Sequence, residues 1–109
     1  MGITKTEGFS LEVNQMAEML KALGHPARLR IMQFLAESPS CICNDLVDEL
    51  PLAQPTISRH LSELKKVGLI KGSIEGKNIC YCIDEPVLDQ IKDLIGDLCA
   101  LSSQNKNCC

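Results

Sequence analysis

The spacing of apolar and polar residues along this chain predicts several short helices. Apolar residues recur three and four positions apart, which is the period of one buried helix face. Each stretch with this period follows a capping residue or a proline, as helix starts commonly do. The predicted helices run over about residues 10–23, 25–37, 41–50, 54–67 and 84–103. In the second, the apolar residues expected to be buried are Leu29, Ile31, Met32 and Leu35.

A different period occupies the gap between the last two helices. Leu69–Ile74 and Ile79–Ile83 are short runs with alternating apolar residues, separated by Glu75-Gly76-Lys77-Asn78. Glycine and asparagine at such a turn predict a β-hairpin. The expected order is therefore α-α-α-α-β-β-α, a mainly α fold with a hairpin wing. Two short helices joined by the tight turn Pro51-Leu52-Ala53 make it a winged helix-turn-helix.

The stretch Gln54–Ile70 has the features of a DNA recognition helix. Ile57, Leu61 and Leu64 form its apolar spine, and Gly68 is placed to end the helix. Its other faces carry short polar and basic side chains, which can read base edges or hold phosphates in a major groove. An ordinary surface helix would show the same amphipathic pattern. The features of the neighbouring segments are therefore needed to distinguish a recognition helix from a surface helix.

The charge distribution favours the DNA-binding interpretation. The chain of 109 residues has a net charge of −3, which is unusual for a DNA-binding protein. Residues 54–78, however, hold five basic and two acidic residues, whereas the segments on either side are each acidic by three charges. Positive charge is thus concentrated on the predicted recognition helix and hairpin, where a DNA contact surface needs it.

Composition indicates one small cytoplasmic domain. We expect residues 1–9 to form a mobile arm, residues 10–103 to form the DNA-binding and dimerisation domain, and residues 104–109 to form a cysteine-terminated tail. No export signal or membrane-spanning run is evident in the sequence. Seven cysteines without an export signal favour free thiols for metal or redox chemistry over a disulfide framework.

Four segments together resemble the ArsR/SmtB family of winged-helix metalloregulatory repressors. They are ALGHPARLRIM (22–32), Cys41-Ile42-Cys43, QPTISRHLSELKKVGLI (54–70) and EGKNICYCI (75–83). The resemblance covers about residues 11–102. It implies a homodimer, formed through the first and last helices, that binds double-stranded operator DNA and leaves it when a metal or metalloid ion binds. It does not imply an enzyme, and no cysteine lies in a Cys-x-x-Cys motif or six residues before an arginine, as rival thiol enzymes would require.

The cysteines suggest which ion is sensed. Cys41 and Cys43 resemble the Cys-Val-Cys opening of the arsenite-sensing members, and thiolates suit soft ions such as As(III) and Sb(III). In those members a third cysteine follows one helical turn later, but Leu46 and Val47 hold the matching positions here. Either two thiolates suffice, or another cysteine completes the site. The candidates for that role are Cys108 and Cys109.

Other sensing sites and chemistries stay open. Cys99, interpreted as a structural residue on the apolar side of the last helix, could instead join Cys108 and Cys109 in a separate site. Cys80 and Cys82 share one face of a strand, and we interpret them as wing packing, with metal binding as the alternative. A thiol redox or persulfide sensor of the same fold is the main rival function. The last helix contains no histidine, which disfavours the zinc site of other members.

The predicted DNA contacts follow from position on the recognition helix and wing. Residues expected to face the major groove or its edges are Gln54, Thr56, Ser58 and Arg59. Residues expected nearer to phosphates are His60, Lys65 and Lys77. A dimer would set two recognition helices roughly 34–36 Å apart, which predicts an operator with an imperfect inverted repeat.

Overall fold

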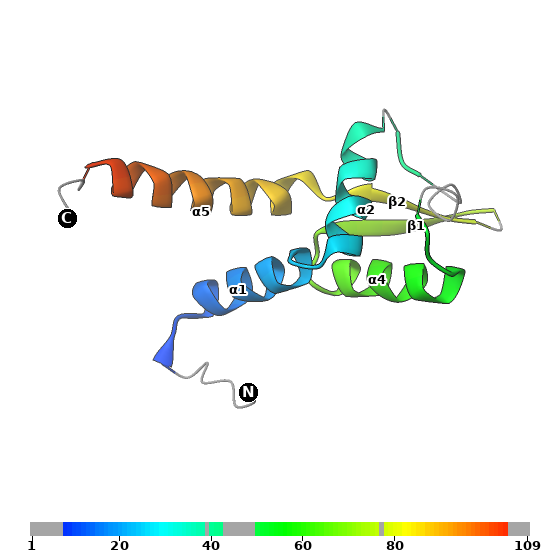
Figure 1. The fold of residues 1–109 in the computed structure, drawn as a ribbon, viewed down its shortest axis with the longest axis horizontal. Coiled ribbons are helices and arrows are strands. Elements are labelled where there is room, and N and C mark those ends of the chain that lie inside the picture. The colour runs from blue at the N-terminus through cyan, green and yellow to red at the C-terminus, as the bar shows by residue number, and fades with distance from the viewer. Residues whose placement is uncertain (1–7, 39, 43–49, 77, 105–109) are drawn as a thin grey trace.

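The computed structural model describes residues 8–38, 40–42, 50–76 and 78–104. Within these described residues, four helices and a hairpin follow one another in the predicted order, the helix predicted over 41–50 apart (Figure 1). They are α1 (Leu11–Leu23), α2 (Pro26–Glu37), α4 (Gln54–Lys66), β1 (Ile70–Glu75), β2 (Asn78–Ile83) and α5 (Glu85–Gln104). The predicted start of a helix at Cys41 is wrong, because Cys41 and Ile42 lie outside any helix. Residues 43–49 of that prediction lie outside the described residues.

Local side-chain and backbone bonds explain where the helices begin and end. The Ser10 hydroxyl accepts a bond from the Val13 amide at 3.2 Å and caps α1. Nδ1 of His25 accepts from the Ala27 amide at 3.0 Å and caps α2, which confirms that His25 is a polar residue at a helix start. Gly68 follows α4 with φ +85°, a conformation that glycine adopts without strain. The amides of Gly68 and Leu69 bond back to Lys65 and Leu64, which completes the helix end.

The wing is a two-stranded antiparallel hairpin. Its register pairs Ile70 with Ile83 at the base and Glu75 with Asn78 at the tip. β1 is displaced by one residue from the predicted run Leu69–Ile74, and β2 begins one residue before the predicted run Ile79–Ile83. Gly76 lies in the turn with φ +65°, as a tight hairpin turn requires.

The core lies where α2, α4 and the base of the hairpin meet. Its members are buried apolar side chains from these elements, and they include Ile31, Met32, Leu35, Ile57, Leu61, Leu64, Leu69, Ile70 and Ile83. The predicted spine of α4 is therefore confirmed. The prediction for Leu29 is wrong, since this side chain is exposed. Through this core α4 packs against α2 and β1.

Helices α1 and α5 lead away from this core on the same side of the molecule (Figure 1). Both carry exposed large apolar side chains, which are Leu11, Val13 and Leu20 on α1 and Ile95, Leu98 and Leu101 on α5. Ile91 is the buried residue of α5. No helix in the described part of the chain has the length and apolar character needed to cross a membrane.

Candidate nucleic-acid interface and cysteine site

Helix α4 turns its spine into the core and its polar residues toward solvent. Ser58, Arg59 and Lys65 are exposed, and Thr56 is partly exposed. Helical spacing places Arg59 on the side of α4 opposite Leu61 and Leu64, so its guanidinium is presented outward. The structure thus brings the predicted base-reading and phosphate-binding residues of α4 onto an open surface.

The first turn of α4 has no side-chain cap. Ala53 occupies the N-cap position and supplies no side-chain bond to the amides that follow. Gln54 donates from Nε2 to the Ser58 hydroxyl at 3.2 Å, which orders two of the predicted reading residues side by side. Pro55 has no N–H, and the Thr56 and Ile57 amides both donate to the Ala53 carbonyl at 3.0 Å. The positive end of the helix dipole is therefore what favours an anionic partner, such as a phosphate, at this end of α4. At the other end of α4, Nζ of Lys66 forms an ion pair with Oε2 of Glu63 at 3.6 Å.

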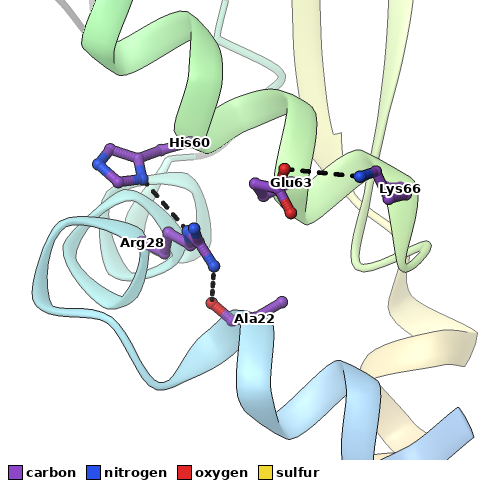
Figure 2. Close-up of polar contacts among 5 residues, drawn as sticks. All are labelled: Ala22, Arg28, His60, Glu63 and Lys66. Carbon is purple, nitrogen blue, oxygen red and sulfur yellow. Dashed lines mark hydrogen bonds and ion pairs between the residues drawn. The ribbon is translucent and has the colours of Figure 1, made fainter. Parts of the chain in front are cut away.

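Arg28, which lies on α2, links the recognition helix α4 to α1 and α2. Its Nε donates to Nδ1 of His60 on α4 at 3.2 Å, and its Nη1 donates to the Ala22 carbonyl on α1 at 3.3 Å. Figure 2 shows the guanidinium lying between these two partners. The His25 ring also packs on the His60 ring, with centroids 4.5 Å apart. The half-buried His60 is therefore held against α2 through one ring nitrogen and one face.

The surroundings of His60 favour its neutral form. Burial lowers its pKa below the ordinary value of 6.5, and the nearby positive groups of His25, Arg28 and Arg59 lower it further. The Glu63 carboxylate acts in the opposite direction. A neutral ring keeps Nδ1 available as the acceptor that Arg28 needs.

The wing adds positive charge beside α4 through an exposed lysine. Lys71 lies on β1, directly opposite Cys82 in the hairpin register. Lys77, which the sequence predicts near phosphates, lies outside the described residues. The described wing therefore offers Lys71 as a cation, a residue that the sequence interpretation did not assign.

Residue 42 attaches the chain before α4 to the wing. The amide of Ile42 donates to the Tyr81 carbonyl at 3.0 Å, and the Tyr81 amide donates back to the Ile42 carbonyl at 2.8 Å. These two residues form an antiparallel bridge next to the hairpin. The segment that contains Cys41 is therefore extended, and it lies along β2.

This bridge brings Cys41 to the wing cysteines. Cys41 and Cys82 are joined by a disulfide, with their Cα atoms 4.7 Å apart. Cys80, which is buried, is also disulfide-bonded. Cys80 is buried in the wing, as the packing interpretation of Cys80 and Cys82 predicts, but that interpretation did not include the disulfide bonds of either residue. The preference for free thiols over disulfides is wrong for Cys41, Cys80 and Cys82. The cause is the bridge, which joins residues far apart in the sequence.

The remaining predicted ligands are not brought into this site by the described structure. Cys43, Cys108 and Cys109 lie outside the described residues. Cys99 is an exposed free thiol on α5 of the single copy, and its structural role on the apolar side of this helix stays a prediction. Among the residues that the structure describes, no group of three or more His, Cys, Asp or Glu side chains could hold a metal ion.

Sequence reasoning missed two functional features of this surface. The sequence shows Arg28 in a short predicted helix that begins at His25. No neighbouring residue, however, indicates that the Arg28 side chain bonds to His60. The signal for Cys82 was stronger. Two Cys-x-Cys motifs in one chain, one on a predicted strand, could have suggested that they pair.

Comparison with known proteins places these features in a family. The model described as bacterial regulatory protein, arsR family, matches residues 25–71. An uncharacterized HTH-type transcriptional regulator of Methanocaldococcus jannaschii is 49% identical over 78 residues, covering 70% of this chain and 86% of that relative. The arsenical resistance operon repressor of Staphylococcus aureus is 28% identical over 98 residues, covering 90% of each chain.

A solved structure shares the fold. It is the homodimeric winged helix-turn-helix DNA-binding domain of a possible ArsR-family regulator from Mycobacterium bovis, determined in solution. The TM-score is 0.67 at 22% identity, and the alignment covers 98% of both chains. The likeness confirms that the described helices and hairpin form a winged helix-turn-helix.

Proposed function

This chain belongs to the arsR family of bacterial regulatory proteins, and from that premise we propose that it is a cytoplasmic repressor released from its operator by As(III) or Sb(III). Members of this family are DNA-binding transcriptional regulators, not enzymes. The single observation that carries the proposal is the attachment of Cys41 to the wing. The Cys41 sulfur, which soft ions bind once it is reduced to a thiol, is thereby placed on the wing of the DNA-reading unit.

Operator recognition uses α4 and the wing. The exposed positions of Ser58, Arg59 and Lys65, and the ordered Gln54–Ser58 pair, support base and phosphate contacts by these residues and Thr56. His60 contributes through its contact with Arg28, and its second ring nitrogen is the one that could approach a phosphate. The sequence alone supports Lys77 in the same role.

The DNA-binding form is a homodimer through α1 and α5. Both helices expose apolar side chains on the side away from the core, and a single copy leaves them in water. The radius of gyration, 16.6 Å, exceeds the value of about 13 Å for a compact domain of this size. A second copy would cover these faces and pair two recognition helices over an imperfect inverted repeat of double-stranded DNA.

The inducer is a thiophilic ion that binds cysteine thiolates around Cys41. The similar protein of Staphylococcus aureus, which is named as an arsenical resistance operon repressor, supports this choice. In the sequence, Cys43 is the partner thiol, and Cys108 and Cys109 are candidates for the third. Reduction of the Cys41–Cys82 disulfide is required before either of these two sulfurs can bind an ion.

A thiol redox switch is the second candidate, favoured by the disulfide itself. A hydroperoxide is a two-electron oxidant that would take two electrons and two protons from the Cys41 and Cys82 thiols, and it would itself be reduced to water and an alcohol. Disulfides in intracellular proteins are commonly redox-sensing. In this case oxidation, rather than an ion, would change the affinity for DNA.

The test begins with selection of the operator from a random-sequence duplex pool. Binding to the selected duplex is then followed by fluorescence anisotropy of labelled DNA. With a phosphine reductant present, arsenite should lower the affinity at least tenfold. If arsenite has no effect but a hydroperoxide lowers the affinity reversibly, the protein is the redox switch. If no duplex is enriched, the proposed repressor function is wrong.

A further inference from the structure

The antiparallel bridge between Ile42 and Tyr81 determines which cysteines face one another. These two residues exchange both of their backbone hydrogen bonds. In such a ladder the adjacent pair is not hydrogen-bonded, and its Cα atoms approach to about 4.5 Å. Cys41 and Cys82 form that adjacent pair, with a Cα separation of 4.7 Å. Their side chains therefore lie on the same face, opposite to Ile42 and Tyr81.

Cys80 lies on this face as well. It is two residues before Cys82 on β2, and alternate residues of a strand point to the same side. The three cysteines differ in exposure. Cys80 is buried, Cys82 is half-buried and Cys41 is exposed. A site made from them would open to solvent at Cys41 and be shielded from water at Cys80.

We propose that the reduced thiols of Cys41, Cys80 and Cys82 form one three-thiolate site that binds As(III) or Sb(III) and fastens the wing to the segment leading into α4. Three thiolates suit a trivalent soft ion. Two of its three ligands come from the wing, in place of Cys43 and of the cysteines of the tail. This inference deepens the proposed function, and its effect on DNA rests on that function.

The binding step is a ligand exchange without a change of oxidation state. Arsenous acid, As(OH)₃, would exchange three As–O bonds for three As–S bonds. Each thiol proton would leave with a hydroxide as water, and arsenic would remain trivalent. Lys71, opposite Cys82 in the register, places a cation beside the thiolates before the ion arrives.

The disulfide and the ion compete for the same sulfurs. The Cys41–Cys82 bond must first receive two electrons and two protons from a reductant, which yields two thiols, and the disulfide of Cys80 must be reduced in the same way. The oxidised state is therefore unable to bind the ion, and all three proposed ligands are in that state in the structure.

Binding at this site would act directly on the DNA-reading surface. β2 pairs along its length with β1, and β1 packs against α4. A new bond from Cys41 to both wing cysteines would change how the wing sits on the chain before α4. The wing and the recognition helix would then no longer fit adjacent parts of one DNA site.

Direct arsenite binding tests the ligand set without DNA. Protein reduced with a phosphine is titrated with sodium arsenite, and near-ultraviolet absorbance of the arsenic–thiolate bonds is recorded. The chain has one tyrosine, Tyr81, and no tryptophan. Because Tyr81 lies between Cys80 and Cys82 in the sequence, its fluorescence reports on the site. We expect one ion per chain in wild type and in the control Cys99→Ser, whose thiol is exposed and free.

Ligand variants should lose this signal. Cys82→Ser and Cys80→Ser should each weaken binding at least tenfold. Cys41→Ser should do the same, and because Cys41 is exposed, this variant tests the site without disturbing a packed position. Wild-type arsenite binding by Cys80→Ser and Cys82→Ser, with loss in Cys108→Ser or Cys109→Ser, would overturn the wing site in favour of the tail.

The operator assay separates this inference from the proposed function. Release of DNA by arsenite in wild type, and equally in Cys82→Ser and Cys80→Ser, would overturn the wing site and leave the arsenite response standing. Binding that needs Cys82 and Cys80 but leaves the operator bound would establish the site and overturn arsenite as the inducer. Absence of arsenite binding by reduced wild type would overturn the site, whatever the operator assay shows.

Discussion

Helices α4 and α5 have the same amphipathic period but very different surroundings. In α4, Ile57, Leu61 and Leu64 are at most 5% exposed, because α2 and β1 cover them. In α5, Ile95, Leu98 and Leu101 are between 45% and 57% exposed. A periodic apolar stripe indicates that one face of a helix is buried against another surface. The stripe alone does not show whether that surface belongs to the same chain or to a second copy, because this depends on which elements pack against the helix.

The largest expected effect comes from removing a covered residue of α4. Leu64→Ala deletes a fully buried side chain in the core. We expect the free energy of unfolding to fall by about 3 kcal/mol, the usual range for such cavities being about 2–5 kcal/mol. Urea unfolding followed by circular dichroism measures it. A loss below about 1 kcal/mol would mean that the core around α4 is poorly packed.

The matched change on α5 should leave the single chain folded. Leu98→Glu puts a charge on the exposed stripe, where it meets water in one copy but would be buried between two. We expect a monomer by analytical ultracentrifugation, with unchanged helix content and at least tenfold weaker operator binding. A dimer of unchanged affinity would show that α5 is not the interface.

A smaller effect is expected on the open side of α4. Arg59→Ala removes an exposed guanidinium opposite the buried spine. We expect operator affinity to fall about tenfold, and the slope of log affinity against log salt to decrease by about one, because one phosphate contact is lost. The dimer should persist. Affinity equal to wild type across the salt range would remove Arg59 from the interface.

The smallest effect concerns the contact that holds α4 to α2. The pKa of His60 is lowered by burial and by the charges of His25, Arg28 and Arg59. The unfolded chain therefore binds more protons than the folded one between the folded-state pKa and 6.5. Stability from neutral His60 is present above pH 6.5 and is lost as pH falls through the folded-state pKa. Unfolding curves at pH 7.5 and 5.5 should differ more in wild type than in His60→Gln.

Local patterns predicted what depends on local physics. The spine of α4, the helix end at Gly68 and the hairpin around Gly76 follow from spacing and backbone preference, and the structure confirms them. Leu29 was assigned to the wrong face because α2 carries apolar residues on more than one side. Burial on such a helix is decided by its neighbours.

The cysteine site could not be predicted from local preference. Cys41 is extended because Ile42 bonds to Tyr81, which is 39 positions along the chain. The residues near Cys41 in the sequence are all compatible with a helix that starts there. The hydrogen bonds to the distant Tyr81 therefore determine that Cys41 is extended. Arg28 is similar, since its acceptor His60 is 32 residues away. Contacts between elements of this kind require the assembled fold.

The junction at Leu69 has a consequence for how this protein can change over evolution. Only Val67, Gly68 and Leu69 separate α4 from β1, and the Leu69 carbonyl accepts a bond from the Asp84 amide at 2.9 Å, just before α5. The reading helix, the wing and the exposed apolar helix thus share one short, buried joint. Insertions and deletions should be rejected there and accepted at loop tips. Ligand cysteines on β2 could meanwhile be exchanged one at a time, so the inducer can diverge while the spacing of the operator is inherited unchanged.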